Sequence, residues 1–201
     1  PMRDTEVALD PAISADDALL ATLRQCLAQI VGNIATAADG RDPAGVHQLR
    51  VGLRRLRSVL WLVGRLAPSA TIAAFRAEAK RLADSAGPPR EWDVFLSSTL
   101  PPIATAVPEP DWGVLREATE TARARAYEGV GATLADRRLT AFVLSLGAWI
   151  ARRGWRLDVP TGALPTLSAP AIDLARTVLE QAYRRVLKAG RRMAHLDAEQ
   201  R

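Results

Sequence analysis

Apolar residues recur at helical spacing along most of the chain. After Ser14 and Asp17, which predict a helix N-cap, an apolar side chain returns every three or four positions: Leu19, Leu20, Leu23, Leu27, Ile30, Val31 and Ile34. This spacing places one apolar stripe on a helix, so it predicts a helix over about 15–38. No segment shows the period of two that a half-buried strand requires. The pattern predicts an all-α protein.

Capping residues and prolines divide the rest of the chain. Asp42 followed by Pro43 predicts the start of a second helix, which should end before Pro68, and Ser69 predicts the N-cap of a third. The remaining expected segments are a turn at SAGPPR, a helix over about 90–100, a proline-rich connector over 101–110, a helix from Asp111 that is interrupted at Gly129 and Gly131, a helix from about Leu139 to Ile150, an irregular loop over about 153–170 and a last helix over about 171–196.

Composition agrees with a globular helical protein. Hydrophobic residues make up 48% and charged residues 24% of the chain, a balance typical of soluble domains. The apolar runs, such as AFVLSLGAWIA, are shorter than the roughly 18–20 residues of a membrane span, and the first residues lack an apolar signal segment. We therefore expect a cytoplasmic protein without a membrane partner. One cysteine, Cys26, allows neither an internal disulfide nor a thiolate zinc site, and we expect it to be a buried apolar side chain.

The net charge of +5 comes from 27 basic and 22 acidic residues, and only Lys80 and Lys188 of the basic residues are lysines. An excess of arginine favours bidentate phosphate binding, but a base-composition bias of the genome also explains it. The total therefore does not identify a ligand. The distribution of the charges is more informative.

The stretch VHQLRVGLRRLRSVL, residues 46–60, contains one histidine and four arginines but no acid. A helix would place most of these basic side chains on one face, together with Arg65 further along the chain. The residues of this face within the stretch are His47, Arg50, Arg54 and Arg57. Leucines occupy the opposite face, and Arg55 lies to one side. Solvated helix faces usually mix charges of both signs, because like charges four residues apart repel. A solvated face is the structural alternative, but the missing acids favour a ligand that supplies the negative charge.

The last predicted helix repeats this division. Its basic side carries Arg184, Lys188, Arg191 and Arg192, joined by His195, and its opposite side is apolar. Two such faces packed in one bundle would enclose a channel for a polyanion, since arginine pairs with phosphate bidentately and lysine and histidine add further donors. A single-nucleotide phosphate loop is not expected, because GVGATLAD lacks the preceding strand and the lysine.

These segments resemble the CHAD family, the "conserved histidine α-helical domain". The stretch at 46–60 is similar to the family's first motif at His47, Arg50, Arg54, Arg55 and Arg57. KRLADSAGPPREWDVF is similar to its next segment, with matches at Lys80, Arg90, Asp93 and Val94, whereas Glu91 replaces an aspartate. DRRLTAFVLSLGAWI and YRRVLKAGRRMAHLDAEQR are also similar, so the resemblance covers nearly the whole chain.

The resemblance implies one helical domain over residues 1–201, with a first bundle over about 14–100 and the start of a second over about 111–196, that binds inorganic polyphosphate. The polyphosphate-binding residues that we expect are His47, Arg50, Arg54, Arg55, Arg57, Lys80, Arg90, Arg138, Arg184, Lys188 and Arg191. The family's second histidine motif would follow LDAEQR, where the sequence ends, and His195 does not replace it. We therefore expect an incomplete second bundle or one completed by another chain, which leaves a homo-oligomer open.

Three functions remain open. The first is noncatalytic binding of polyphosphate, associated with polyphosphate granules, with sulfate or phosphate ions occupying the same site. The second is general nucleic-acid binding, which the scarcity of aromatic residues disfavours for single strands. The third is a phosphoanhydride hydrolase or its accessory domain. Because that chemistry uses carboxylates to hold magnesium and the basic stripes contain none, we expect no catalytic residue, metal or cofactor. Glu91 and Asp93 in the segment KRLADSAGPPREWDVF are the candidate acids for such chemistry, but we expect Asp93 to pair with an arginine instead.

Overall fold

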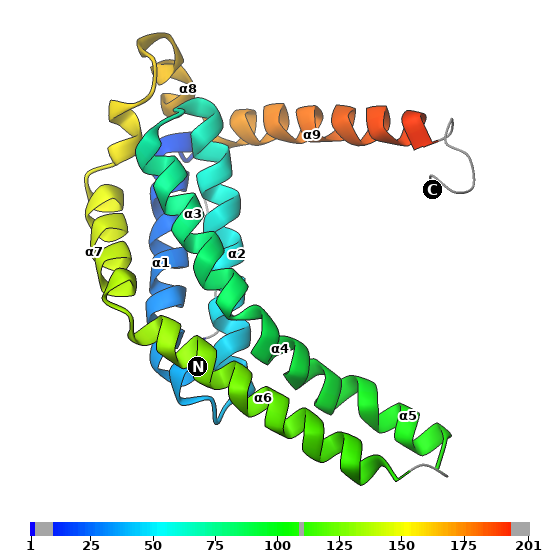
Figure 1. Cartoon of the computed structure of the whole chain (residues 1–201). Helices are drawn as coiled ribbons and strands as arrows, with labels where there is room; N and C mark the ends of the chain where they lie inside the picture. The colour runs from blue at the N-terminus through cyan, green and yellow to red at the C-terminus, as the bar shows by residue number, and fades with distance from the viewer. Residues whose placement is uncertain (3–9, 109–110, 194–201) are drawn as a thin grey trace. The chain divides into compact units, whose positions relative to one another are not determined.

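The structure, a computed structural model, describes residues 1–2, 10–108 and 111–193, and helices dominate these ranges (Figure 1). In chain order the elements are α1 (Ala15–Asp39), α2 (Pro43–Leu66), α3 (Ala70–Ser85), α4 (Gly87–Val94), the π-helical η1 (Phe95–Thr99), α5 (Leu100–Ala106), α6 (Trp112–Ala135), α7 (Arg137–Ala151), the 3-10 helices η2 (Gly154–Leu157) and η3 (Thr161–Ala163), α8 (Leu164–Ser168) and α9 (Ala171–Met193). The described residues form one isolated bridge, between Ser14 and Pro170, and no named strand. The predicted all-α fold is confirmed.

Backbone contacts divide the chain into two compact units. The first comprises Pro1–Val7 and Leu20–Val159, and the second comprises Ala8–Leu19 and Pro160–Arg201. Helices α2 to α7 and most of α1 belong to the first unit, whereas α8 and α9 belong to the second. This division does not coincide with the connector at about 101–110 that separates the two expected bundles. A single domain over residues 1–201 stays a prediction.

A common apolar core joins the helices of the first unit. The largest fully buried side chains of α1, α2, α3 and α7 are Leu23, Ile30, Leu49, Leu53, Leu56, Leu60, Ile72, Leu82, Leu146 and Ile150. The leucines of α2 are those of its predicted apolar face, and burying each contributes about 1.5–3 kcal/mol. Two glycines of α2, Gly45 and Gly52, allow this helix to pack close to α1. At Gly45 a Cβ would lie only 2.7 Å from the backbone carbon of Thr36.

The helices α4 and α5 lie alongside α6 in a long helical hairpin within the first unit (Figure 1). Two sequence predictions are wrong here, because SAGPPR and the connector over 101–110 are partly helical. α4 begins at Gly87 with prolines in its first turn, and α5 begins at Leu100 in the same way. Proline is accepted there because the first amides of a helix have no intrahelical partner.

The predicted interruption of α6 at Gly129 and Gly131 is also wrong, since the helix runs without a break to Ala135. Each glycine costs a helix about 1 kcal/mol relative to alanine. The buried side chains of Tyr127, Val130 and Leu134 lie on the same segment. Their burial outweighs the weak local preference of the glycines.

In the second unit, Ser14 caps α1 as predicted, because its Oγ accepts a hydrogen bond from the Asp17 amide at 3.1 Å. The expected irregular loop before α9 contains the short helices η2, η3 and α8. The large apolar side chains of α9 are mostly exposed, among them Leu179 and Val186.

By length and composition, helix α1 could cross a membrane. Leu23 and Ile30 are fully buried in the first unit, as in a core helix, so this criterion is weak evidence.

Candidate functional site

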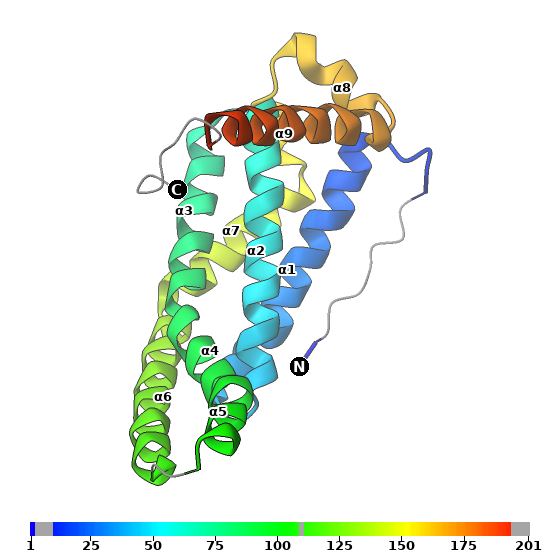
Figure 2. The same ribbon diagram turned by 90° about the vertical axis from the view of Figure 1, so that its right-hand side faces the viewer.

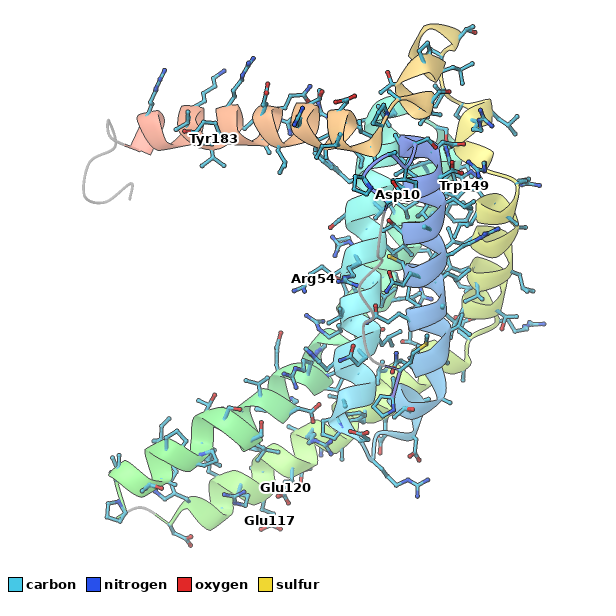
Figure 3. All side chains as sticks on the ribbon, turned by 180° about the vertical axis from the view of Figure 1, so that it is seen from behind. Asp10, Arg54, Glu117, Glu120, Trp149 and Tyr183 are labelled. Carbon is cyan, nitrogen blue, oxygen red and sulfur yellow. The ribbon has the colours of Figure 1, made fainter. Side chains whose placement is uncertain are left out.

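The amphipathic helix α2 presents the predicted basic face. Asp42 caps the helix by accepting the Ala44 amide at 2.9 Å, and Pro43 occupies its first turn. Because the leucines of α2 are buried against the core, its basic residues stand on the other side. Arg54 is exposed and projects outward from α2 (Figure 3). Arg57 is exposed as well, whereas His47 and Arg50 are half-buried.

Much of the positive charge on this face is not balanced by ion pairs with the described acids of the same chain. In the described part of the chain, no carboxylate forms an ion pair with His47, Arg54, Arg57 or Arg90. Like charges this close repel. An anion bound here would therefore relieve repulsion as well as gain hydrogen bonds.

Arg50 has a structural contact that the sequence did not predict. Its Nη1 donates to the carbonyl oxygen of Ala83, in the last turn of α3, at 2.9 Å. Carbonyls at a helix C-terminus carry partial negative charge and lack an intrahelical donor. Arg50 thus fixes α3 against α2 while it keeps its positive charge near the basic face.

Three arginines lie close enough to His47 to influence its charge. Burial lowers the pKa of His47, and the charges of Arg90, Arg54 and Arg50 lower it further. Arg90 comes from α4, so two helices supply this cluster. A bound polyanion would reverse the effect of the arginines and favour the imidazolium, which donates from both ring nitrogens.

A groove of about 570 Å³ runs between α2 and α3, which lie side by side (Figure 2). Its lining residues are Arg54, Arg57, Ser58, Trp61, Ala73, Arg76, Ala77 and Lys80. No acid is among them, although Lys80 pairs with Asp84 at 2.5 Å one turn further along α3. The predicted residues Arg54, Arg57 and Lys80 therefore meet in one groove.

Arg76 is a member of this groove that the sequence analysis missed. It lies one turn before Lys80 on α3, so the two share a helix face, and this spacing was the available signal. Arg76 is exposed and forms no ion pair with the described residues. Its charge is therefore available to a ligand in the groove.

A second groove of about 490 Å³ lies between α1 and α2. It is lined by Thr22, Gln25, Cys26, Arg54, Arg55, Ser58 and Val59. Arg54 and Ser58 line both grooves, so the basic face of α2 continues from one to the other. Cys26 is buried, as predicted. Arg55 is half-buried here, and its contribution to ligand binding stays a prediction.

The remaining predicted residues lie on α7 and α9. Arg138, at the start of α7, pairs with Glu78 at 3.1 Å, and Glu78 also pairs with Arg81 at 2.6 Å. The residues on α9 belong to the second unit and are exposed: Arg184, Lys188 and Arg191. Arg184 lies 3.8 Å from Glu180 on the same helix. The roles of these four residues stay predictions, and His195 lies outside the described residues.

Asp93 pairs with an arginine, as predicted. Its buried carboxylate accepts from Arg123 Nε at 2.7 Å and from the Tyr127 hydroxyl at 2.8 Å, both on α6. Burial, and then the hydrogen bond to the carboxylate, raise the pKa of Tyr127. Asp93 therefore joins α4 to α6. Glu91, two residues earlier, is exposed.

The chain was compared with known proteins. A family model described as CHAD domain matches residues 21–201. The structure is similar to the crystal structure of the CHAD domain from the plant Ricinus communis, with 31% identity and a TM-score of 0.73. This match covers 100% of the chain and 64% of the plant chain. No curated protein matches. With its family model spanning most of the sequence and its α2 motif already resembling that family, the chain belongs to the CHAD domain family.

Proposed function

We propose that the protein binds inorganic polyphosphate, without catalysis, on the basic face of α2 and in the groove between α2 and α3. The observation that carries the proposal is the lining of that groove, which contains Arg54, Arg57, Arg76 and Lys80 and no acid. The three arginines form no ion pair with described residues, whereas Lys80 pairs with Asp84. The charge that balances them comes from the ligand.

The spacing of the cations suits a repeating polyanion. His47, Arg50, Arg54 and Arg57 follow one another along one face of α2, with about 5 Å per helical turn. Guanidinium groups bind phosphate oxygens bidentately, and Lys80 adds a mobile charge. Successive phosphates of one chain would meet successive cations, so long chains gain affinity through several linked contacts. Free sulfate or phosphate ions would occupy the same positions more weakly.

Catalysis is not part of the proposal. Phosphoanhydride cleavage normally uses carboxylates that hold magnesium beside the phosphates, and the groove lining offers none. Asp93 is engaged with Arg123 and Tyr127. The residues that line the groove can bind phosphate, but they offer no carboxylate to hold magnesium beside it.

A titration with long-chain polyphosphate at fixed ionic strength tests the proposal. The double variant Arg54→Ala/Arg57→Ala should lose at least tenfold in affinity and show a shallower dependence on salt, because fewer counterions are released. The double variant Arg116→Ala/Arg125→Ala is the matched control for the loss of two charges, since both arginines are exposed on α6 and line neither groove. Equal affinity of the Arg54→Ala/Arg57→Ala variant and this control would refute the proposal.

Nucleic acid is the competing polyanion. Contacts to DNA or RNA phosphates weaken with salt in the same way, so salt dependence alone does not separate the two ligands. Competition at one salt concentration does. We expect polyphosphate to displace a bound single-stranded oligonucleotide at a lower phosphate concentration than the oligonucleotide needs to displace bound polyphosphate. The opposite order would favour a nucleic-acid-binding function.

A further inference from the structure

The groove between α2 and α3 has two chemically different ends. The helices are antiparallel and joined by residues 67–69, so the lining residues nearest the connection lie together. These are Trp61 on α2 and Ala73 on α3. At the far end Arg54 lies on α2 and Lys80 on α3. The groove therefore changes along its length from an aromatic end to a cationic end.

The aromatic end has the features of a stacking site. Trp61 is half-buried and lines the groove, and the guanidinium of Arg65 lies 5.2 Å from the centre of its ring. This cation–π contact restrains the indole. From α3 this end of the groove is lined by Ala73, whose side chain is a single methyl group. A planar group can enter there more easily than between two large side chains.

The cationic end begins one turn away. Arg57 precedes Trp61 by four residues and Arg54 precedes it by seven, about 10 Å along the helix axis. Arg76 and Lys80 face them from α3. This distance is comparable to the length of a ribose and a short run of phosphates. The groove volume of about 570 Å³ also lies within the range of small-molecule sites.

We propose that this groove also takes nucleoside triphosphates, with the base stacked on Trp61 and the triphosphate bound by Arg54, Arg57, Arg76 and Lys80. The inference rests on the proposed phosphate binding and adds a second ligand class. Inorganic polyphosphate has no apolar end and gains nothing from an indole, whereas a nucleotide has one planar end and one anionic end. Stacking tolerates any base, so ATP and GTP should bind with similar affinity and compete with polyphosphate.

The test compares ATP with inorganic tripolyphosphate, which has the same number of phosphates, in magnesium-free buffer at fixed ionic strength. ATP carries less negative charge, so charge alone predicts weaker binding than for tripolyphosphate. With stacking, ATP should bind at least as tightly. Trp61→Leu should lower the affinity for ATP about tenfold and change the affinity for tripolyphosphate less than twofold. Trp61→Phe, which keeps an aromatic ring, should retain most of the ATP affinity.

Trp112→Leu on α6 is the matched control, because Trp112 lines neither groove, and it should leave both affinities unchanged. The melting temperature of each variant checks that it folds. Weaker binding of ATP than of tripolyphosphate by the wild type, or an equal loss of both ligands in Trp61→Leu, would overturn the inference. If neither tripolyphosphate nor long polyphosphate binds the wild type, the proposed function itself fails, and with it the inference.

Discussion

Replacing Asp93 with alanine removes the carboxylate that ties α4 to α6. The side chain of Asp93 is 2% exposed and that of Arg123 is 26% exposed, and 2.7 Å separates the carboxylate oxygen from Nε. Tyr127 donates to the other carboxylate oxygen at 2.8 Å. The variant would leave a half-buried guanidinium and a buried hydroxyl without their acceptor.

The size of the effect follows from this geometry. Removing one partner of a buried ion pair costs about 3–5 kcal/mol, and the partial exposure of Arg123 lets water recover some of this, so we expect a loss of about 3 kcal/mol. Tyr127→Phe removes one hydrogen bond to a charged group and should cost about 2 kcal/mol. Because both changes act on the same carboxylate, the double variant should lose at least 1 kcal/mol less than the sum.

Urea denaturation followed by circular dichroism measures these losses, and a polyphosphate titration on the same samples separates stability from binding. Affinity for polyphosphate should stay within about twofold of the wild type, because Asp93 lines neither groove. A stability loss below about 1 kcal/mol for Asp93→Ala would contradict the reasoning. Unchanged stability with a large loss of affinity would instead make Asp93 a functional residue.

Three further predictions concern α2 and α6. Gly45→Ala should destabilise the protein by about 1–3 kcal/mol, since the new methyl group would meet the Thr36 backbone at 2.7 Å, whereas Gly129→Ala, with nothing within 4 Å, should stabilise it by about 0.5–1 kcal/mol; thermal denaturation of the pair checks both signs. Polyphosphate affinity should rise as the pH falls, because the pKa of His47 lies below its usual value in the free protein and a bound polyanion raises it; calorimetric titrations across neutral pH should show the trend, and His47→Gln should flatten it. Arg50→Ala should lower the free energy of unfolding by about 1 kcal/mol, because the hydrogen bond to the Ala83 carbonyl is lost. The same variant should bind polyphosphate more weakly. Unchanged stability of the variant would contradict the structural role of Arg50.

The sequence alone identified α2 and its two faces. Asp42, Pro43 and Pro68 bound the helix, and its spacing of leucines and basic residues placed the core on one side and the charges on the other. It also provided the motif that led to the CHAD family. Capping and amphipathic periodicity depend on residues within about one turn of each other, so they can be read along the chain.

Prolines and glycines were less reliable guides. Local preference predicted breaks at Pro88 and Pro89, at Pro101 and Pro102, and at the glycines of α6, yet the chain is helical at all of these positions. The prolines fall in first turns, where no hydrogen bond is lost. The glycines lie in a helix whose buried residues contribute more than the glycines cost. Such cases depend on where a neighbouring helix begins and packs.

Tertiary structure decided which charges remain available. Arg50 bonds to Ala83 and Arg138 to Glu78, partners that are 33 and 60 residues away in sequence. Arg76 and Lys80 join Arg54 and Trp61 only because α3 folds back along α2. The pattern of one helix fixes which side chains share a face, since that depends on the helical repeat. Whether a face is neutralised, buried or open to a ligand depends on the element packed against it, and this contact exists only in the folded chain.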